Sequence, residues 1–538
     1  MQRRLKTFLL SRNNDSIPAA IAGFLLIQLL SWHGGIGISP DSVVYLSTAQ
    51  NIHDHGAIND FTNTPMMDFP AFYPVFLSGI IFLTGRAVPA FGPILNSLLF
   101  ALLIWLCGWM MDRFTRTSRW YKWTLLLFIM GSPCLLEVYS MIWSETLFLL
   151  LSVLFMIGCH RYFQRHSTTS LLLIAVIAGL VSITRYAGVS IIAMGGLLML
   201  CDGRLRWGPR KIAHLALYGL VSTSFLAWNI YRNYKVTGTF TGYREKGLTS
   251  LAANLHDFGS VLCDWLPFFN ERYGWATVIA IGFCLLLTGI FLFRLVRKVN
   301  FFSYDTIAIS YFVVYAFFIL TTATISRFQQ LDSRLLSPLF LPWLWGSTCW
   351  MPAIPGLLRR RGPAEPKLEV PVAERAPSGR MTAEPGRWKK GWMLAALLGT
   401  GCFLWGEWSA FQFNWIGIKY AGIPGYTEDT WQQSATMAYV RANKDKLRQA
   451  GHIYSSAYEG LWFLGNVSAE IIPHKDNPDD IRYMMIDDHF SVVWFNDSIN
   501  DDLIDMDYIK AHKLLVEEHD FNDGAVYFFR TAKGVASH

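Results

Sequence analysis

Long uninterrupted blocks of apolar residues constrain the fold of this 538-residue chain more than any other feature. Hydrophobic residues make up 52% of the chain and charged residues only 16%, whereas an ordinary soluble domain carries about 25% charged residues. A block of about 20 apolar residues spans a bilayer as a helix, because a helix satisfies its own backbone hydrogen bonds. The sequence therefore predicts a polytopic α-helical membrane protein and excludes a secreted disulfide scaffold, a disordered chain and a nucleic-acid-binding domain.

About eleven blocks are candidate transmembrane helices. They cover residues 17–33, 88–111, 121–140, 143–160, 168–185, 187–201, 212–230, 274–293, 303–323, 335–351 and 391–408. Basic residues cluster before the first block and in alternate connections, namely Arg3, Arg4, Lys6, Arg12, Arg113, Arg116, Arg119, Lys122, Arg161, Arg165, Arg204, Arg206, Arg210, Lys211, Arg294, Arg297 and Lys298. Cytoplasmic connections are enriched in Lys and Arg, so we expect the N-terminus inside. The loop 34–72 has no Lys or Arg and should face out.

The C-terminal part continues this charge pattern. Residues 1–351 form the predicted transmembrane module, and the Pro-, Arg- and Glu-rich stretch 352–390 reads as a disordered cytoplasmic linker. The last span, 391–408, then leads to an outer tail, 409–538. The tail has 11 basic and 19 acidic residues, a net charge of −8, so the rest of this +7 chain carries +15. A basic membrane part and an acidic outer tail are typical of a cytoplasmic-membrane protein.

The tail has the pattern of a small α/β domain. Residues 428–450 and 502–519 are predicted helices, and residues 452–456, 491–497 and 524–530 are predicted strands. Alternating strands and helices indicate a small, mostly parallel sheet.

The outer loop contains the first candidate site residue. Its segment PDSVVYLSTAQNIHDHG begins with Pro40-Asp41-Ser42 and ends at Gly56, so it predicts a helix that is too short and polar to span. Such a helix lies along the membrane surface and places Asp41 at the boundary between lipid and water. The alternative interpretation is that Asp41 only caps this helix.

Further charged residues stand at the predicted outer ends of the spans. Asp68 and Glu145 are carboxylates that could accept a proton from an attacking hydroxyl. Arg185, Arg232 and Arg334 could bind a phosphate and stabilise it as a leaving group. The alternatives are a solvated loop acid, a helix-start acid and arginines that extend to the membrane interface. Together these residues predict a site for a membrane-embedded substrate with a phosphate at the interface.

The order of the segments FPAFYPVF, WSETLFLLL, TRYAG and DSRLLSPLF, after an outer-loop acid, resembles the GT-C fold polyprenyl-phosphate-sugar glycosyltransferases. The bacterial protein mannosyltransferase-like and aminoarabinose-transferase-like members are the most similar. The resemblance covers residues 15–345. It implies an inverting transfer on the outer face, from a polyprenyl-phosphate-linked sugar to a glycan, lipid or protein acceptor of the cell envelope.

The resemblance also implies roles for individual residues. Asp41 corresponds to the general base, and Asp68 and Glu145 correspond to the second and third acids of the family. Arg185 and Arg334 correspond to positions near the lipid phosphate. The chain departs from the family where a serine rather than a second acid follows Asp41, and where DFPAFYP replaces the usual EKPPLYY.

Cofactor use is left open by the sequence. A divalent metal is compatible with the family, but the run His53-Asp54-His55 has poor metal-ligand spacing and no metal ligand is assigned. The chain has no nucleotide-binding glycine motif, so no nucleotide cofactor is expected.

Three other functions are alternatives. Polytopic helices with charged residues also fit a transporter or lipid flippase, although the spans show no two-fold repeat. An acyl-type transferase or ligase would need an outer Ser or His nucleophile set. A sensor or scaffold could bind envelope glycans through the aromatic residues of IYSSAYEGLWFLGN (453–466), which are more often core residues. The sugar and the acceptor are not specified by the sequence.

Overall fold

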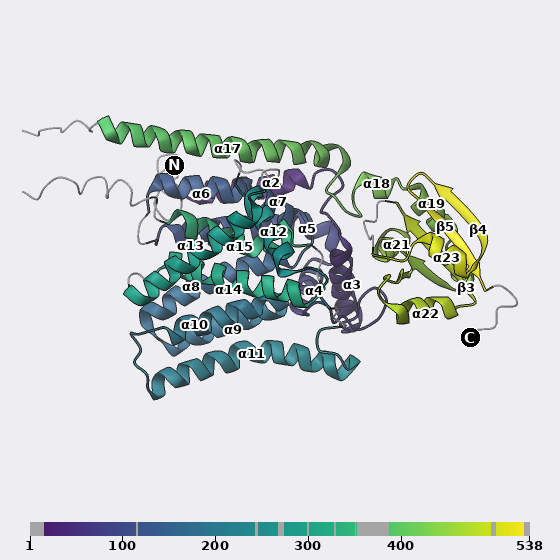
Figure 1. The fold of residues 1–538 in the computed structure, drawn as a ribbon, viewed down its shortest axis with the longest axis horizontal. Coiled ribbons are helices and arrows are strands. Elements are labelled where there is room, and N and C mark those ends of the chain that lie inside the picture. The colour runs from purple at the N-terminus through teal and green to yellow at the C-terminus, as the bar shows by residue number, and fades with distance from the viewer. Residues whose placement is uncertain are drawn as a thin grey trace, which may run out of the picture.

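The protein is elongated, with a helical body and a small sheet domain at one end (Figure 1). The computed structural model describes residues 15–114, 117–242, 246–266, 274–298, 301–327, 330–349, 351, 387–496 and 502–531. The predicted linker therefore lies outside the described residues, except for residues 387–390.

The body consists of apolar helices that run side by side along the long axis (Figure 1). A helix covers each predicted span: α2 (Ile17–Leu30), α5 (Val88–Met111), the pair α6 (Arg119–Gly131) and α7 (Pro133–Ser140), α8 (Glu145–Arg165), α9 (Thr168–Thr184), α10 (Val189–Leu200), α11 (Pro209–Thr237), α13 (Ala276–Arg297), α14 (Tyr304–Ile325), α15 (Ser333–Thr348) and α17 (Arg387–Ala421). Within the described residues, α5, α8, α13 and α14 are long and apolar enough to cross a membrane by themselves. The total of eleven spans stays a prediction.

Two spans differ from the sequence prediction in shape. The span 121–140 is broken into α6 and α7, which meet at an angle of 48°. Pro133 lacks a backbone N–H and its ring clashes with the preceding turn, which favours a break in the helix at this position. Ser132 instead caps α7 by accepting a hydrogen bond from the backbone N–H of Leu135. The last helix, α17, continues beyond the predicted span to Ala421.

Shorter helices accompany the body. The predicted outer-loop helix is present as α3 (Pro40–His55), and it lies across the end of the body that faces the sheet domain (Figure 1). Ser39 and Ser42 form a reciprocal capping box at its start, and Gly56 ends it with a φ of 67°. Asp41 is therefore not the capping residue of this helix. The helices α4 (Phe72–Thr84) and α12 (Leu251–Asp264) and the 3-10 turn η1 (Tyr186–Gly188) were not predicted.

The C-terminal domain is a five-stranded mixed sheet with short helices. Its strands are β1 (His452–Ser455), β2 (Glu470–Ile471), β3 (His489–Phe495), β4 (Leu514–Phe521) and β5 (Gly524–Arg530), in the order β2-β1-β3-β5-β4. Its helices are α18 (Asp429–Gln432), α19 (Ala435–Ala442), α20 (Lys444–Gln449), α21 (Tyr458–Gly465), α22 (Pro478–Ile486) and α23 (Met506–His512).

Two predictions for this domain were wrong. Only β2, β1 and β3 are parallel, whereas β5 is antiparallel to both β3 and β4. The predicted helix 502–519 is the short helix α23 followed by β4. The side chains of LLVEEHDF alternate between more and less exposed positions, which is the two-residue period of a strand. Residues 522–523 then form the turn of a hairpin with β5.

The domain is attached to the body by polar and apolar contacts. In the first loop, Ile38 O accepts a hydrogen bond of 2.7 Å from the backbone N–H of Tyr426, and the backbone approaches so closely that a Cβ at Gly425 would lie 2.5 Å from the same oxygen. In the connection after α14, Arg327 forms ion pairs with Asp476 and Asp502. Residues of α3, α4 and the domain also share one apolar cluster.

Candidate functional site

Four of the predicted charged residues form one group of ion pairs where the body meets the C-terminal domain. Arg334 bridges two carboxylates, because its guanidinium pairs with Asp41 and its Nε lies 2.7 Å from Oε1 of Glu145. Arg185 Nη1 lies 2.5 Å from the same oxygen of Glu145. The side chain of Glu145 is 0% exposed, while that of Asp41 is 30% exposed. The buried carboxylate thus fixes both arginines, and the outer carboxylate remains accessible.

Helix ends position these side chains. Glu145 is the first residue of α8, Arg185 is the residue at which the chain leaves α9 in an extended conformation, and Arg334 lies in the first turn of α15. The cap of α15 is Asp332, whose side chain accepts a hydrogen bond of 2.7 Å from the backbone N–H of Leu335. Asp41 enters the group from the first turn of α3.

Uncharged side chains hold the group in place. The guanidinium of Arg334 lies 4.0 Å from the centre of the Trp143 ring, a cation–π contact. The indole N–H of Trp143 donates to Ser39 Oγ at 2.7 Å. Ser144 Oγ lies 3.1 Å from the hydroxyl of Tyr45 and accepts a hydrogen bond of 3.2 Å from Arg185. Burial raises the pKa of Tyr45, so its hydroxyl stays protonated.

A cavity of about 270 Å³ adjoins Asp41. Its lining residues are Pro40, Asp41, Val44, Asp60, Phe61, Thr64, Pro65, Met66, Met67, Asp68, Phe69, Tyr458 and Glu459. The first eleven belong to α3 and the loop after it, and the last two to α21 of the C-terminal domain. The cavity therefore lies between the two parts of the protein and brings Asp68 to the same space as Asp41.

Glu459 is a carboxyl group that the sequence reasoning missed. Burial raises its pKa to about 7, and the nearby carboxylate of Asp41 adds to this rise, whereas the hydroxyls of Tyr458 and Tyr426 act in the opposite direction. In the sequence, the segment 453–466 stands out only for its aromatic residues. No sequence signal indicates that α21 faces the loop after α3, because this contact depends on how the domain docks.

Arg232 is placed differently from Arg185 and Arg334. Its Nη1 donates to Met66 O and its Nη2 to Ile58 O, both at 2.8 Å, so it binds the backbone of the loop after α3. Within the described residues it is not part of the ion-pair group. Asp68 lies close to Gly242, where a Cβ would meet its Oδ1 at 2.1 Å.

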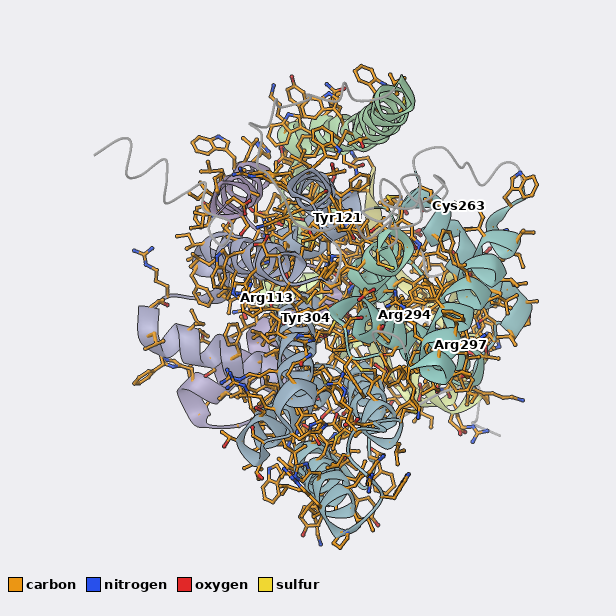
Figure 2. The ribbon with its side chains drawn as sticks, turned by 90° about the vertical axis from the view of Figure 1, so that its left-hand side faces the viewer. Arg113, Tyr121, Cys263, Arg294, Arg297 and Tyr304 are labelled. Carbon is orange, nitrogen blue, oxygen red and sulfur yellow. The ribbon has the colours of Figure 1, made fainter. Side chains whose placement is uncertain are left out.

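The opposite end of the body carries a different set of charges. Figure 2 views this end and labels three of its arginines. Arg113 follows α5, and Arg294 and Arg297 lie in the last turn of α13. Arg294 pairs there with Asp305 at 2.7 Å. The candidate site and these arginines thus lie at opposite ends of the apolar helices.

Two solved structures of ArnT from Cupriavidus metallidurans are similar to this chain over nearly its whole length. The apo structure matches with a TM-score of 0.53 and 13% identity, over 96% of this chain and 98% of ArnT. The structure bound to undecaprenyl phosphate matches with a TM-score of 0.50 and 12% identity, over 95% and 97%. The chain has the fold of ArnT. The predicted resemblance to the GT-C glycosyltransferases, of which ArnT is one, is thereby confirmed for the fold. No protein-family model and no curated protein sequence matches the chain.

Proposed function

We propose that this protein is an inverting glycosyltransferase that moves a sugar from a polyprenyl-phosphate donor to an acceptor hydroxyl of the cell envelope. The observation that carries the proposal is the accessible carboxylate of Asp41, which lines the cavity and forms an ion pair with Arg334. The buried carboxylate of Glu145 holds Arg334 in place. The ArnT fold, seen in one structure with undecaprenyl phosphate bound, supports a lipid-phosphate donor.

In the proposed reaction, the acceptor hydroxyl transfers its proton to Asp41 while its oxygen attacks the anomeric carbon of the sugar. The bond from this carbon to the phosphate oxygen breaks, and the lipid phosphate leaves with the electron pair. Arg185 and Arg334 stabilise its negative charge. A guanidinium has five N–H donors, and the bonds of Arg334 to Asp41 and Glu145 use two of them. Within the described residues, this leaves further N–H groups of Arg334 that can bind the phosphate.

The structure favours different roles for the remaining candidates. We propose that Glu145 holds the two arginines rather than contacting the acceptor, because it is buried beneath them. We propose that Arg232 shapes the outer loop through its bonds to two carbonyl groups. Asp68 stays a candidate for contact with the sugar or acceptor, since it lines the cavity.

We propose that the protein lies in the cytoplasmic membrane with its N-terminus inside and the C-terminal domain outside. Arg113, Arg294 and Arg297 support this orientation, because they lie at the end of the body away from that domain (Figure 2), and basic residues mark the cytoplasmic side.

The decisive experiment has two steps. Mass spectrometry of lipid extracts from cells that lack the protein should reveal an accumulated polyprenyl-phosphate sugar, which identifies the donor. The purified protein in detergent should then transfer this sugar from the isolated lipid to membranes of the same cells, a result that a transporter cannot produce. Asp41→Asn should lower turnover by orders of magnitude, while Asp54→Asn, at an exposed position of α3, should not. Near-normal transfer by purified Asp41→Asn protein would remove Asp41 as the base.

A further inference from the structure

The cavity next to Asp41 has walls from two parts of the chain. One wall is α3 and the loop that follows it, and the other is the start of α21 in the C-terminal domain, with Tyr458 and Glu459. Asp41, Asp60, Asp68 and Glu459 all line the cavity, so carboxyl groups stand on both of its walls.

Glu459 lines the cavity from the side of the C-terminal domain. It lies in the first turn of α21, and within the described residues it makes no ion pair. Its environment disfavours the charged form, because the group is buried and lies close to Asp41. The hydroxyl groups of Tyr426 and Tyr458 are its polar neighbours. A carboxyl group that is kept in such surroundings and opens onto a cavity is a candidate for ligand contact.

Aromatic rings continue the same wall. The ring of Phe61 from the outer loop lies 5.6 Å from the ring of Tyr458 and 5.6 Å from that of Trp462, centre to centre. The aromatic rings of the loop and of α21 therefore pack against each other beside the cavity that Asp41 and Glu459 line. Apolar and aromatic walls with a few convergent polar groups are typical of small-molecule sites.

We infer that the C-terminal domain supplies one half of the acceptor site, with Glu459 accepting a hydrogen bond from the acceptor while Asp41 takes the proton of the attacking hydroxyl. The unit that enters the cavity is a hydroxyl-bearing group, such as a sugar ring. This inference rests on the proposed function, since it assigns the acceptor side of that reaction.

The test compares Glu459→Gln with Glu470→Gln, which makes the same change at an exposed position of the same domain. The full-length proteins are assayed in detergent with the donor lipid isolated from cells that lack the protein, and with membranes of those cells as the source of acceptor. Initial rates are measured against the amount of acceptor membrane and against the donor concentration. Binding of undecaprenyl phosphate, followed by native mass spectrometry, reports that the donor side is intact.

At pH 8, above the pKa of about 7 of Glu459, Glu459→Gln replaces a charged hydrogen-bond acceptor by an uncharged one, which should raise the apparent KM for the acceptor membranes about tenfold. The donor KM and the binding of undecaprenyl phosphate should stay unchanged, and Glu470→Gln should behave like the wild type. An unchanged acceptor KM in Glu459→Gln, or an equal change in both KM values, overturns the assignment of Glu459 while the transfer by the wild type stands. Absence of transfer by the wild-type protein overturns the proposed function and this inference together.

Discussion

Replacement of Glu145 tests the ion-pair group most directly, because Arg185 and Arg334 contact the same oxygen atom of its carboxylate at 2.5 and 2.7 Å. The change Glu145→Gln keeps the shape of the side chain and removes the charge between two guanidinium groups. The arginine side chains are only 17% and 14% exposed, so water screens them poorly. Removing one partner of a buried ion pair costs about 3–5 kcal/mol. We expect a loss of this size in the free energy of unfolding.

The measurement is unfolding of the purified protein in mixed detergent micelles by titration with dodecyl sulfate, followed by tryptophan fluorescence. The set of variants is Glu145→Gln, Arg185→Gln and the double variant. The double variant removes both charges, so its loss should fall short of the sum of the single losses by about 0.5–3 kcal/mol. The exposed control Asp54→Asn should change stability by less than about 0.5 kcal/mol. A loss below about 1 kcal/mol for Glu145→Gln, the range of a surface pair, or strict additivity would refute the reasoning.

Three further predictions concern single side chains. Arg185→Ala removes a donor to the leaving phosphate. It should raise the activation free energy by about 3–4 kcal/mol, which lowers turnover about a hundred- to a thousandfold. Turnover of the purified variant within a few fold of the wild type would contradict this role. Arg232→Ala should speed amide hydrogen exchange in residues 56–68 and leave the binding of undecaprenyl phosphate intact, whereas loss of that binding would assign Arg232 to the phosphate. The pKa of Glu459 is raised from an ordinary value of 4.5 to about 7, so the folded protein binds more protons and its stability falls as the pH rises through this window. Glu459→Gln should therefore match the wild type in free energy of unfolding at pH 4 and exceed it at pH 8, and identical pH profiles would exclude the raised pKa.

The helices of the body could be predicted from the sequence because a long apolar block allows few structures other than a buried or membrane-embedded helix. The helix that carries Asp41 could also be located, since Pro40 and Gly56 mark its ends. The short apolar helix α4 was missed because Pro70 precedes it and Pro74 lies in its first turn, so its 13 residues resemble a re-entering segment. In the C-terminal domain, β4 was mistaken for helix, because LLVEEHDF contains residues that also favour helices.

The identities of the site residues could be predicted, but their partners could not. Arg334 lies 293 residues from Asp41 and 189 residues from Glu145 along the chain. The predicted membrane topology indicated that these residues share one end of the body. Only the packing of α8, α15 and α3 decides which carboxylate each arginine binds. The contribution of Glu459 depends on the docking of a separate domain, and no local pattern reports it.

The attachment of the C-terminal domain has a mechanical consequence for the site. Arg327 is tied to Asp476 and Asp502 of the domain, and a short distance further along the chain Arg334 bridges Asp41 and Glu145. We therefore expect a tilt of the C-terminal domain to move Arg327 and, along the chain, the start of α15 with Arg334. The position of the domain and the position of this positive charge should then change together.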